Sequence, residues 1–170
     1  MILHLLTIPE ITERWLRLRN LPDHPYYHPE GTTFQHVLKV YNRATKTSNI
    51  NLIFTALIHD ICKADTGYWK EYKGVQYWSN PDHPKQAYDL LMSCDDLKFY
   101  IWTQQANYKL IADICLYHQQ VKELTDYTRF LRRQLQGNTE LLNYLLAFRE
   151  LDDMINRYEN IHQSKQDNQC

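Results

Sequence analysis

One segment of the chain is apolar on nearly all sides, and it constrains the fold more than any other feature. Its apolar residues are Leu52, Ile53, Phe54, Ala56, Leu57, Ile58 and Ile61. A helix with this pattern has no polar face to expose, so it is typical of the central, buried helix of a domain. We expect Asn51 to cap its N-terminus.

The rest of the chain also shows helical periodicity, which predicts an all-α fold. Further helices are expected at 8–19, from Thr32 or Thr33 onward, at 85–93, at 95–118 with a break near Gln105, and from 138–140 to the end of the domain. Only four glycines and six prolines are present, which disfavours a sandwich or barrel with many tight turns. The segment 20–31 holds three prolines and is predicted to be a loop. The aromatic segment 65–84 is predicted to be a long surface loop, a kind that often serves as a lid or binding loop.

Length and composition limit the class of protein. The 170 residues predict one domain at 1–162 and a frayed polar tail at 163–170. A hydrophobic content of 44% and a net charge of −1 exclude a disordered chain and do not support a strongly basic nucleic-acid binder. The four cysteines lack paired spacing, so we expect reduced thiols and a cytoplasmic protein. No apolar run reaches the roughly 20 residues that a membrane helix needs.

Histidines and aspartates on these helices carry the candidate chemistry. His59 and Asp60 follow the apolar segment, where burial is costly unless the pair is neutralised or binds a metal ion. The alternative for this pair alone is an exposed helix end. Imidazoles and carboxylates on three other helices complete a set typical of a metal site in a helical core: His36, His118 and the pair Asp152-Asp153.

With these residues the sequence resembles the HD-domain metal-dependent phosphohydrolases, whose signature is a His, a His-Asp pair and a distant Asp. It is most similar to the HD domain of bacterial CCA-adding tRNA nucleotidyltransferases. The similar segments are YHPEGTTFQHVLKV (27–40), ALIHDICKAD (56–65), DHPKQAYDLL (82–91), ICLYHQQ (114–120) and LDDMINR (151–157). Cys62 and Asp82 stand where that group usually has glycine. A chain of this length has no room for the nucleotidyltransferase head, so the tRNA substrate is not implied.

The resemblance implies a single compact helical HD domain with a long aromatic loop after the His-Asp pair. It also implies a metal ion held by His36, His59, Asp60 and Asp153. Adjacent helical residues point about 100° apart, so only one of Asp152 and Asp153 can face the site. Arg157 follows Asp153 at the family's spacing and favours it, with Asp152 as the alternative. His83 and His118 match positions that hold a second metal in two-metal members and contact phosphate or water in others.

Four residues are candidates for catalysis. Lys63 lies four residues after His59, so on a helix the two side chains share one face. Its ammonium group would suit a phosphate oxygen beside the metal. The alternative is a solvated lysine at a helix end. Asp60 is expected to bridge metals or to orient water as a base. His28 is expected to contact the substrate, to act as a general acid or to be a structural hydrogen-bonding group, and Arg157 is a further candidate for stabilising charge. Mixed imidazole and carboxylate ligands suit Mn, Fe, Co, Ni or Zn better than Mg.

The expected reaction is metal-assisted hydrolysis of a small phosphate ester. Aromatic side chains after the His-Asp pair either stack on a nucleotide base or cover the core: Tyr68, Trp69, Tyr72, Tyr77 and Trp78. Near-neutral charge favours a nucleotide over a nucleic acid. The basic cluster of Arg129, Arg132 and Arg133 is typical of a solvated helix face.

Two other functional classes remain open from the sequence. Some HD-type proteins hold two irons with the same six positions and cleave C–C or C–P bonds with O₂. Lys63 favours the hydrolase, because HDxxK marks phosphate chemistry in the family. A non-catalytic binding module is the third alternative, which the complete ligand set disfavours.

Overall fold

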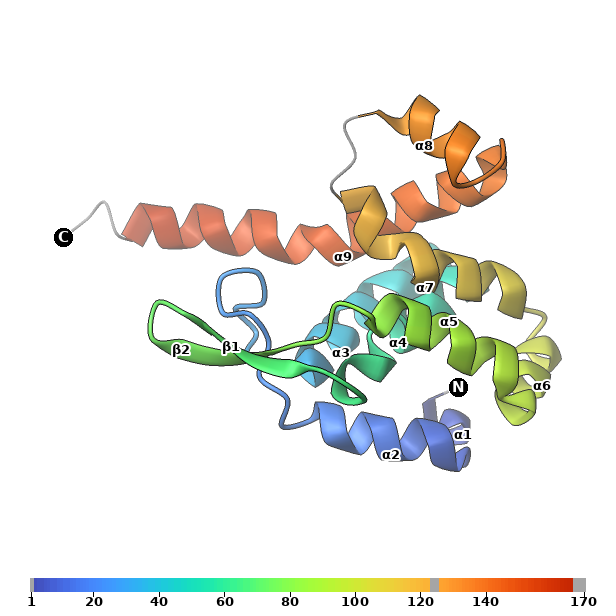
Figure 1. Ribbon diagram of the computed structural model, residues 1–170, viewed down its shortest axis with the longest axis horizontal. Helices are drawn as coiled ribbons and strands as arrows, with labels where there is room; N and C mark the ends of the chain where they lie inside the picture. The colour runs from blue at the N-terminus through green and yellow to red at the C-terminus, as the bar shows by residue number, and fades with distance from the viewer. Residues whose placement is uncertain (1, 123–125, 167–170) are drawn as a thin grey trace.

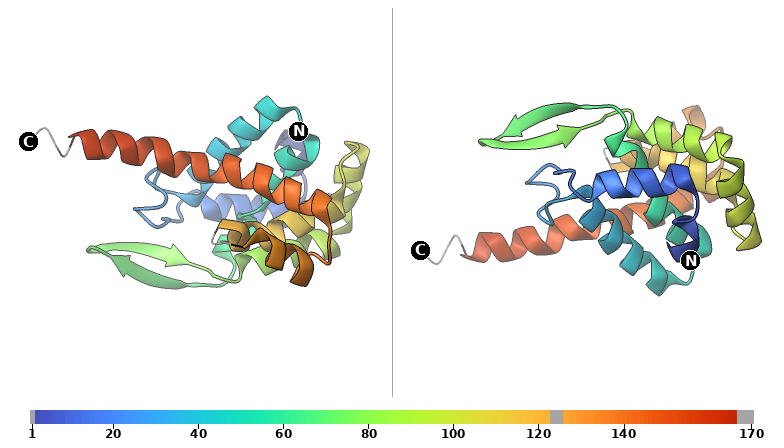
Figure 2. Two further views of the ribbon diagram at one scale, coloured as in Figure 1. Left: turned by 90° about the horizontal axis from the view of Figure 1, so that it is seen from above. Right: turned by 90° about the horizontal axis from the view of Figure 1, so that it is seen from below.

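A computed structural model of the chain describes the backbone of residues 2–122 and 126–166 and the side chains of residues 3–122 and 126–153. In chain order the elements are α1 (Ile2–Leu5), α2 (Pro9–Leu18), α3 (Thr33–Ala44), η1 (Thr45–Thr47), α4 (Ile50–Ile58), η2 (Ile61–Ala64), β1 (Tyr68–Tyr72), β2 (Val75–Ser79), α5 (His83–Ser93), α6 (Asp95–Thr103), α7 (Tyr108–Lys122), α8 (Tyr127–Arg133) and α9 (Thr139–Gln166). The helices gather into one body, as Figure 1 shows. The β1–β2 hairpin, the loop at 20–31 and the C-terminal half of α9 project from the same end of that body (Figure 2).

Helix α4 is the centre of the fold, which confirms the prediction for the apolar segment. Every residue from Leu52 to Ile58 is buried. Phe54, on one side, belongs to an apolar cluster with α2, α5, α6 and α7. Ala56, on the other side, belongs to a second cluster with α3, α7, α8 and α9. Burial on both sides explains why the segment lacks a polar face.

The N-terminal cap of α4 is Asn49, so the prediction of Asn51 was wrong. The side-chain oxygen of Asn49 accepts hydrogen bonds from the backbone N–H groups of Asn51 and Leu52, at 3.1 and 3.2 Å. Asn49 has the extended backbone that a cap requires. Asn51 instead accepts a bond from the backbone N–H of Asn107 and so joins α4 to the start of α7.

The predicted break between α6 and α7 is confirmed at residues 104–107. Gln105 has a φ of 60°, a left-handed conformation that an α-helix cannot continue through. The last helix begins at Thr139, as expected, and its backbone remains helical to Gln166, beyond the predicted end of the domain. None of the described helices has the length and apolar character needed to cross a membrane.

The predicted long loop after the His-Asp pair contains a β-hairpin. Strands β1 and β2 are antiparallel, with Trp69 opposite Trp78. Lys73 and Gly74 both have positive φ, as a two-residue type I′ turn requires. The Trp78 backbone N–H donates to the carbonyl of Pro22, and its indole N–H donates to the carbonyl of Lys63. The hairpin is therefore attached both to the proline-rich loop and to the turn that follows the His-Asp pair.

Candidate metal centre and pocket

Four buried imidazoles from four helical segments converge on one carboxylate. His36 comes from α3, His59 directly follows α4, His83 begins α5 and His118 lies on α7. All four are at most 2% exposed. The carboxylate is that of Asp60, which lies where the α-helix α4 gives way to the 3₁₀ turn η2. This change of helix type turns Asp60 toward the imidazoles instead of continuing the face of α4.

The two oxygens of Asp60 divide the imidazoles into two pairs. Oδ1 lies 2.8 Å from His83 Nε2 and 3.7 Å from His118 Nε2. Oδ2 lies 3.4 Å from His59 Nε2 and 3.7 Å from His36 Nε2. Each pair forms, with Asp60, a group whose ligand atoms lie within 4.8 Å of one another. The arrangement has the form of two adjacent cation sites that share one carboxylate.

Each imidazole is oriented by an acceptor on its other nitrogen. Nδ1 lies 3.1 Å from the Ala56 carbonyl in His59, 2.6 Å from the Asn80 carbonyl in His83 and 2.7 Å from the Cys115 carbonyl in His118. These carbonyls can only accept, so Nδ1 carries the proton and donates it. The unshared electron pair is therefore on Nε2 and faces Asp60, which is the orientation found in histidines that bind metals.

His36 follows the same pattern with a side chain that the sequence analysis did not single out. Its Nδ1 lies 2.8 Å from Oε1 of Glu30, a carboxylate in the loop that precedes α3. Glu30 was visible in the sequence only as part of the segment 27–40. Hydrogen bonds from His28 and His36 overcome the effect of burial and hold the pKa of Glu30 well below its usual range.

Asp152, rather than Asp153, contributes the carboxylate of α9. Asp152 is 2% exposed, and its Oδ1 lies 3.0 Å from His36 Nε2. Asp153 pairs with Arg149 at 3.1 Å and lies 3.7 Å from Lys122. The geometry therefore favours Asp152, the alternative given by the sequence, over Asp153 as the ligand. Arg157, whose spacing favoured Asp153, lies outside the residues whose side chains are described.

Six buried residues form a group that fits a divalent metal ion, and this group is called the histidine–aspartate cluster. Its members are His36, His59, Asp60, His83, His118 and Asp152. Among the described residues, His36 and Lys122 lie close to the two buried oxygens of Asp152, but neither contact has the geometry of a hydrogen bond. The unshared pair on His36 Nε2 faces one of these oxygens, a contact that repels unless a proton or a metal ion lies between the two atoms. The cluster combines imidazole nitrogens with carboxylate oxygens, which suits transition metals.

The charges of the cluster are reflected in its pKa values. Burial opposes the charged form of His36, but Asp152 and Glu30 outweigh it and raise the pKa to about 9. For Asp60, burial acts against ionisation, yet the neighbouring His59 and Lys63 keep its pKa well below the usual range. Burial and the nearby His59 lower the pKa of His118, so it is neutral at pH 7 and can act as a ligand.

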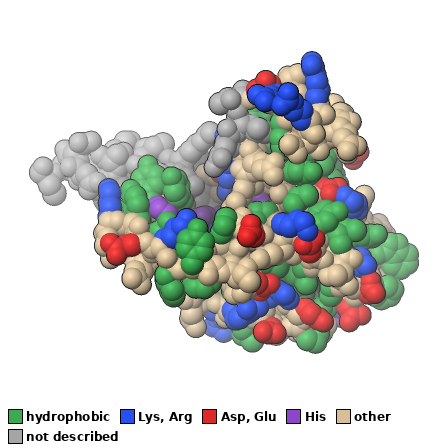
Figure 3. Space-filling view, in the orientation of Figure 1, with side chains coloured by type: hydrophobic (Ala, Val, Ile, Leu, Met, Phe, Trp, Pro, Cys, Tyr) green, Lys and Arg blue, Asp and Glu red, His purple; other side chains and the backbone are tan. Residues whose placement is uncertain are grey.

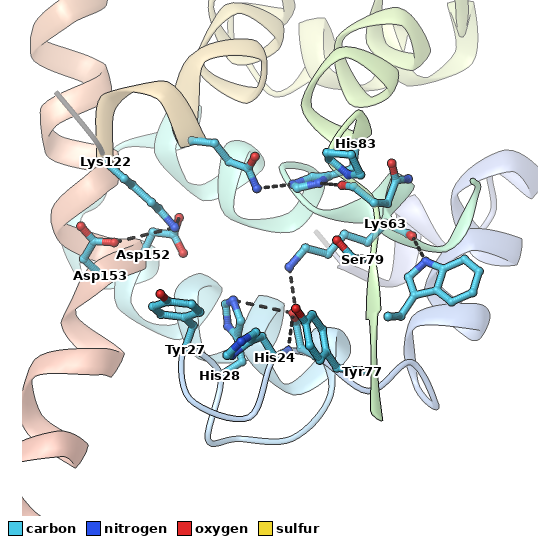
Figure 4. Close-up of a pocket in the computed structure, with 15 residues that line it drawn as sticks. His24, Tyr27, His28, Lys63, Tyr77, Ser79, His83, Lys122, Asp152 and Asp153 are labelled. Atoms are coloured by element: carbon cyan, nitrogen blue, oxygen red, sulfur yellow. Dashed lines mark hydrogen bonds and ion pairs between the residues drawn. The ribbon is translucent and has the colours of Figure 1, made fainter. Parts of the chain in front are cut away.

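A pocket of about 610 Å³ opens beside the cluster, within the range of small-ligand sites. Figure 4 shows Lys63, Lys122 and His83 around its inner part, with Tyr27 and Tyr77 nearer the loop and the hairpin. The lining residues are Asp23, His24, Tyr27, His28, Lys63, Tyr77, Trp78, Ser79, Asn80, Pro81, His83, Gln119, Lys122, Asp152 and Asp153. The pocket thus joins cations beside the cluster to aromatic rings farther out.

Lys63 lines this pocket, although not for the reason that the sequence indicated. It lies in η2 and not on α4, so it does not share a continuous helix face with His59. Its Nζ lies 2.8 Å from Oδ2 of Asp23 and 3.1 Å from Oδ2 of Asp60. These two carboxylates overcome the cost of burial and raise the pKa of Lys63 above its usual value, so the ammonium group is charged at neutral pH.

His28 also lines the pocket, in the loop between α2 and α3. Its Nδ1 lies 3.3 Å from Oε1 of Glu30, and its Nε2 lies 3.8 Å from Oδ1 of Asp23. Burial, followed by the charge of Lys63, lowers the pKa of His28. Asp23 is buried and accepts a further bond from the Thr33 hydroxyl. Neither Asp23 nor Glu30 was identified from the sequence, because both belong to a loop whose path depends on the helices beneath it.

The aromatic residues of the hairpin divide between the pocket and the solvent. Tyr77 and Trp78 line the pocket, whereas Tyr68 and Trp69 are more than half exposed. His24, from the proline-rich loop, packs against Tyr77 with ring centroids 4.5 Å apart. The pocket's aromatic side is therefore built from the loop and the hairpin together.

The arginine cluster on α8 is a solvated face, as expected. Arg129, Arg132 and Arg133 are exposed. Figure 3 shows Lys and Arg side chains over this part of the molecule. The cluster does not line the pocket.

Comparison with known proteins gives one match. The HD domain family model matches residues 33–159, a range that contains the whole histidine–aspartate cluster and Lys63. No curated protein and no solved structure matches the chain.

Proposed function

The chain belongs to the HD domain family, whose members are commonly metal-dependent phosphohydrolases, and on that premise we propose that it hydrolyses a small phosphate ester. One observation carries the proposal: the histidine–aspartate cluster borders a pocket in which two lysine ammonium groups lie beside its carboxylates. Positive charge beside a metal centre suits the oxygens of a phosphoryl group. The finer resemblance to the HD domain of CCA-adding enzymes stays a prediction.

The proposed ligands fall into two sets that share Asp60. One set is His36, His59, Asp60 and Asp152, and the other is Asp60, His83 and His118. When bound there, a divalent metal such as Mn, Fe, Co, Ni or Zn would polarise a phosphoryl oxygen and lower the pKa of a water molecule.

The chain's own groups orient the substrate and hold protons. Lys63 donates hydrogen bonds to a phosphoryl oxygen from the inner wall of the pocket, where burial strengthens the interaction. His28 is neutral at pH 7 because its pKa is lowered, which supports its role as a hydrogen-bonding group rather than a general acid. Asp23 fixes Lys63, and Glu30 fixes His28 and His36.

The proposed substrate class is a nucleotide. His24, Tyr27 and Tyr77 lie on the pocket's outer side, where they can stack on a base or contact a sugar. The net charge of −1 supports a small molecule over a nucleic acid, since binding a phosphate backbone requires many cations.

Metal analysis combined with a phosphate-release screen tests the proposal. The purified chain is expected to contain one or two equivalents of transition metal and to release phosphate from a panel of nucleotides and cyclic nucleotides. Two irons with oxygen uptake and no phosphate release would instead support the di-iron oxygenase. Neither bound metal nor turnover would support the binding module.

Metal binding should release a proton at neutral pH. The pKa of about 9 means that His36 is protonated at pH 7 until a metal replaces its proton. Below pH 9 the metal affinity should therefore rise about tenfold per pH unit, and above it the rise should stop. Calorimetry in buffers of different ionisation enthalpy measures the released proton. An affinity for Mn²⁺ that is constant between pH 7 and 9 would contradict this expectation.

Lys63→Met should reduce hydrolysis far more than metal binding. Removal of one preorganised charge contact typically costs roughly 10²–10³ in rate. Because Asp23 would lose its buried partner, the stability of Lys63→Met is also expected to fall. The double variant Lys63→Met/Asp23→Asn removes both charges and should recover stability but not kcat/KM. A loss of less than threefold in both variants would show that Lys63 does not touch substrate.

A further inference from the structure

Lys122 reaches into the pocket from the end of α7, one helical turn after His118. Its Nζ lies 2.6 Å from Oδ2 of Asp152 and 3.7 Å from Oδ1 of Asp153. Figure 4 shows the side chain extending toward α9, on a different side of the pocket from Lys63. With its side chain 29% exposed, Lys122 is open to a molecule in the pocket.

The partners of Lys122 distinguish it from the other pocket lysine. Lys63 is held by Asp23, a buried carboxylate outside the histidine–aspartate cluster. The closest partner of Lys122 is Asp152, a proposed metal ligand, and its second partner Asp153 is already paired with Arg149. A metal ion and the ammonium group therefore compete for the charge of Asp152, and positive charge on Lys122 becomes available whenever the metal takes that carboxylate.

We propose that Lys122 is a substrate-binding residue of this site, whose ammonium group binds the phosphoryl group opposite Lys63 and competes with metal for Asp152. This inference rests on the proposed function. It adds that metal and anion each strengthen the binding of the other. A metal ion on Asp152 frees the Lys122 ammonium group for the anion, and an anion on Lys122 frees Asp152 for the metal. Two cations on different sides of the pocket would hold two oxygens of one phosphoryl group and so orient it.

The proposal predicts opposite effects on two ligands. Lys122→Met should weaken the binding of inorganic phosphate to the Mn²⁺-loaded protein by roughly ten- to a hundredfold, the usual effect of losing a hydrogen bond to a charged group. The same variant should bind Mn²⁺ more tightly when no anion is present, because a cation that competes for Asp152 is gone. Removal of a residue that only stabilises the fold would instead lower the affinity for both Mn²⁺ and phosphate.

The experiment measures Mn²⁺ and inorganic phosphate binding by calorimetry in the wild type and three variants. Lys122→Arg should restore most of the phosphate affinity. Lys109→Met is the matched control, since Lys109 lies on the same helix and pairs on the surface with Asp113, four residues on; it should leave both affinities unchanged. Thermal unfolding verifies that each variant is folded, and Lys122→Gln replaces Lys122→Met if the latter is not.

Two results would overturn the proposal: unchanged phosphate affinity in Lys122→Met, or a loss of Mn²⁺ affinity that parallels the loss of phosphate affinity. If Lys122→Met does not fold, Lys122→Gln takes its place, because glutamine also lacks the positive charge, and the same two results in Lys122→Gln would overturn the proposal. Failure of the proposed function is distinguishable, because the wild-type chain itself would then bind no metal and release no phosphate.

Discussion

Replacement of Asp60 by asparagine should remove bound metal and phosphate release together while preserving the helical content. Asp60 is the residue on which all four Nε2 atoms converge, at 2.8–3.7 Å. An amide has no negative charge, and one of its two oxygen positions becomes an NH₂ group that cannot bind a metal. Loss of an outer partner alone costs 10- to 100-fold in metal affinity, so loss of this shared ligand should lower activity by on the order of 10³ or more.

Elemental analysis, kcat/KM and far-ultraviolet circular dichroism measure these three quantities for Asp60→Asn. Asp89→Asn is the control, because Asp89 is an exposed carboxylate on α5 that pairs with Lys85. Exposed pairs of this kind contribute about 0–1 kcal/mol, so metal content and rate should not change in the control. Full activity with metal retained in Asp60→Asn would refute the assignment of the centre.

Helix positions were predictable because burial leaves a strong pattern in the sequence. The segment around Phe54 is apolar on both sides because α4 contacts an apolar cluster on each side. The choice between Asn49 and Asn51 as its cap was not predictable in the same way. Both residues can cap a helix, and only the local backbone angles and the contact of Asn51 with Asn107 decide between them.

The hairpin escaped prediction because its residues lack the pattern of a half-buried strand. Most residues of β1 are exposed on both faces, so no alternation of apolar and polar residues marks it. Its turn places Lys73 at positive φ, where asparagine or aspartate is the usual signal. The hairpin is held instead by Trp78, whose contacts with Pro22 and Lys63 are distant in sequence.

The four imidazoles and Asp60 could be identified from sequence, but the groups that fix them could not. Asp23 and Glu30 lie in a proline-rich loop without periodicity, and their roles arise only when that loop folds over α3 and η2. Three of the imidazoles are fixed by backbone carbonyls, which no residue type reveals. The side chains that touch the proposed metals were therefore more predictable than the groups that orient them.

Asp152 is the exception, because the sequence did contain its signal. Leu141, Leu145 and Phe148 are buried on one face of α9, at successive steps of four and three residues. A further step of four reaches Asp152, whereas Asp153 falls about 100° away. The family spacing to Arg157 favoured Asp153, but the helical phase of the apolar residues decides which carboxylate faces the core.

The substitutions Asp152→Asn and Asp153→Asn should therefore have very different effects. Asp152→Asn removes the carboxylate that lies 3.0 Å from His36 Nε2, and it should lower both metal occupancy and kcat/KM by about 10²-fold or more. Asp153→Asn removes a partly exposed pair with Arg149, so the expected change in rate is less than roughly threefold. The two substitutions are chemically identical and adjacent in one helix, so each controls for the other.

Metal occupancy separates the two carboxylates more clearly than rate does. In Asp152→Asn the set containing His36 and His59 loses a ligand, while His83, His118 and Asp60 remain, so a wild type with two metals should fall toward one. Asp153→Asn should keep the wild-type stoichiometry and lower the unfolding temperature only slightly. The reverse result would be loss of metal from Asp153→Asn and its retention in Asp152→Asn. It would mean that α9 presents its other face to the site and that the spacing to Arg157 identifies the metal ligand correctly.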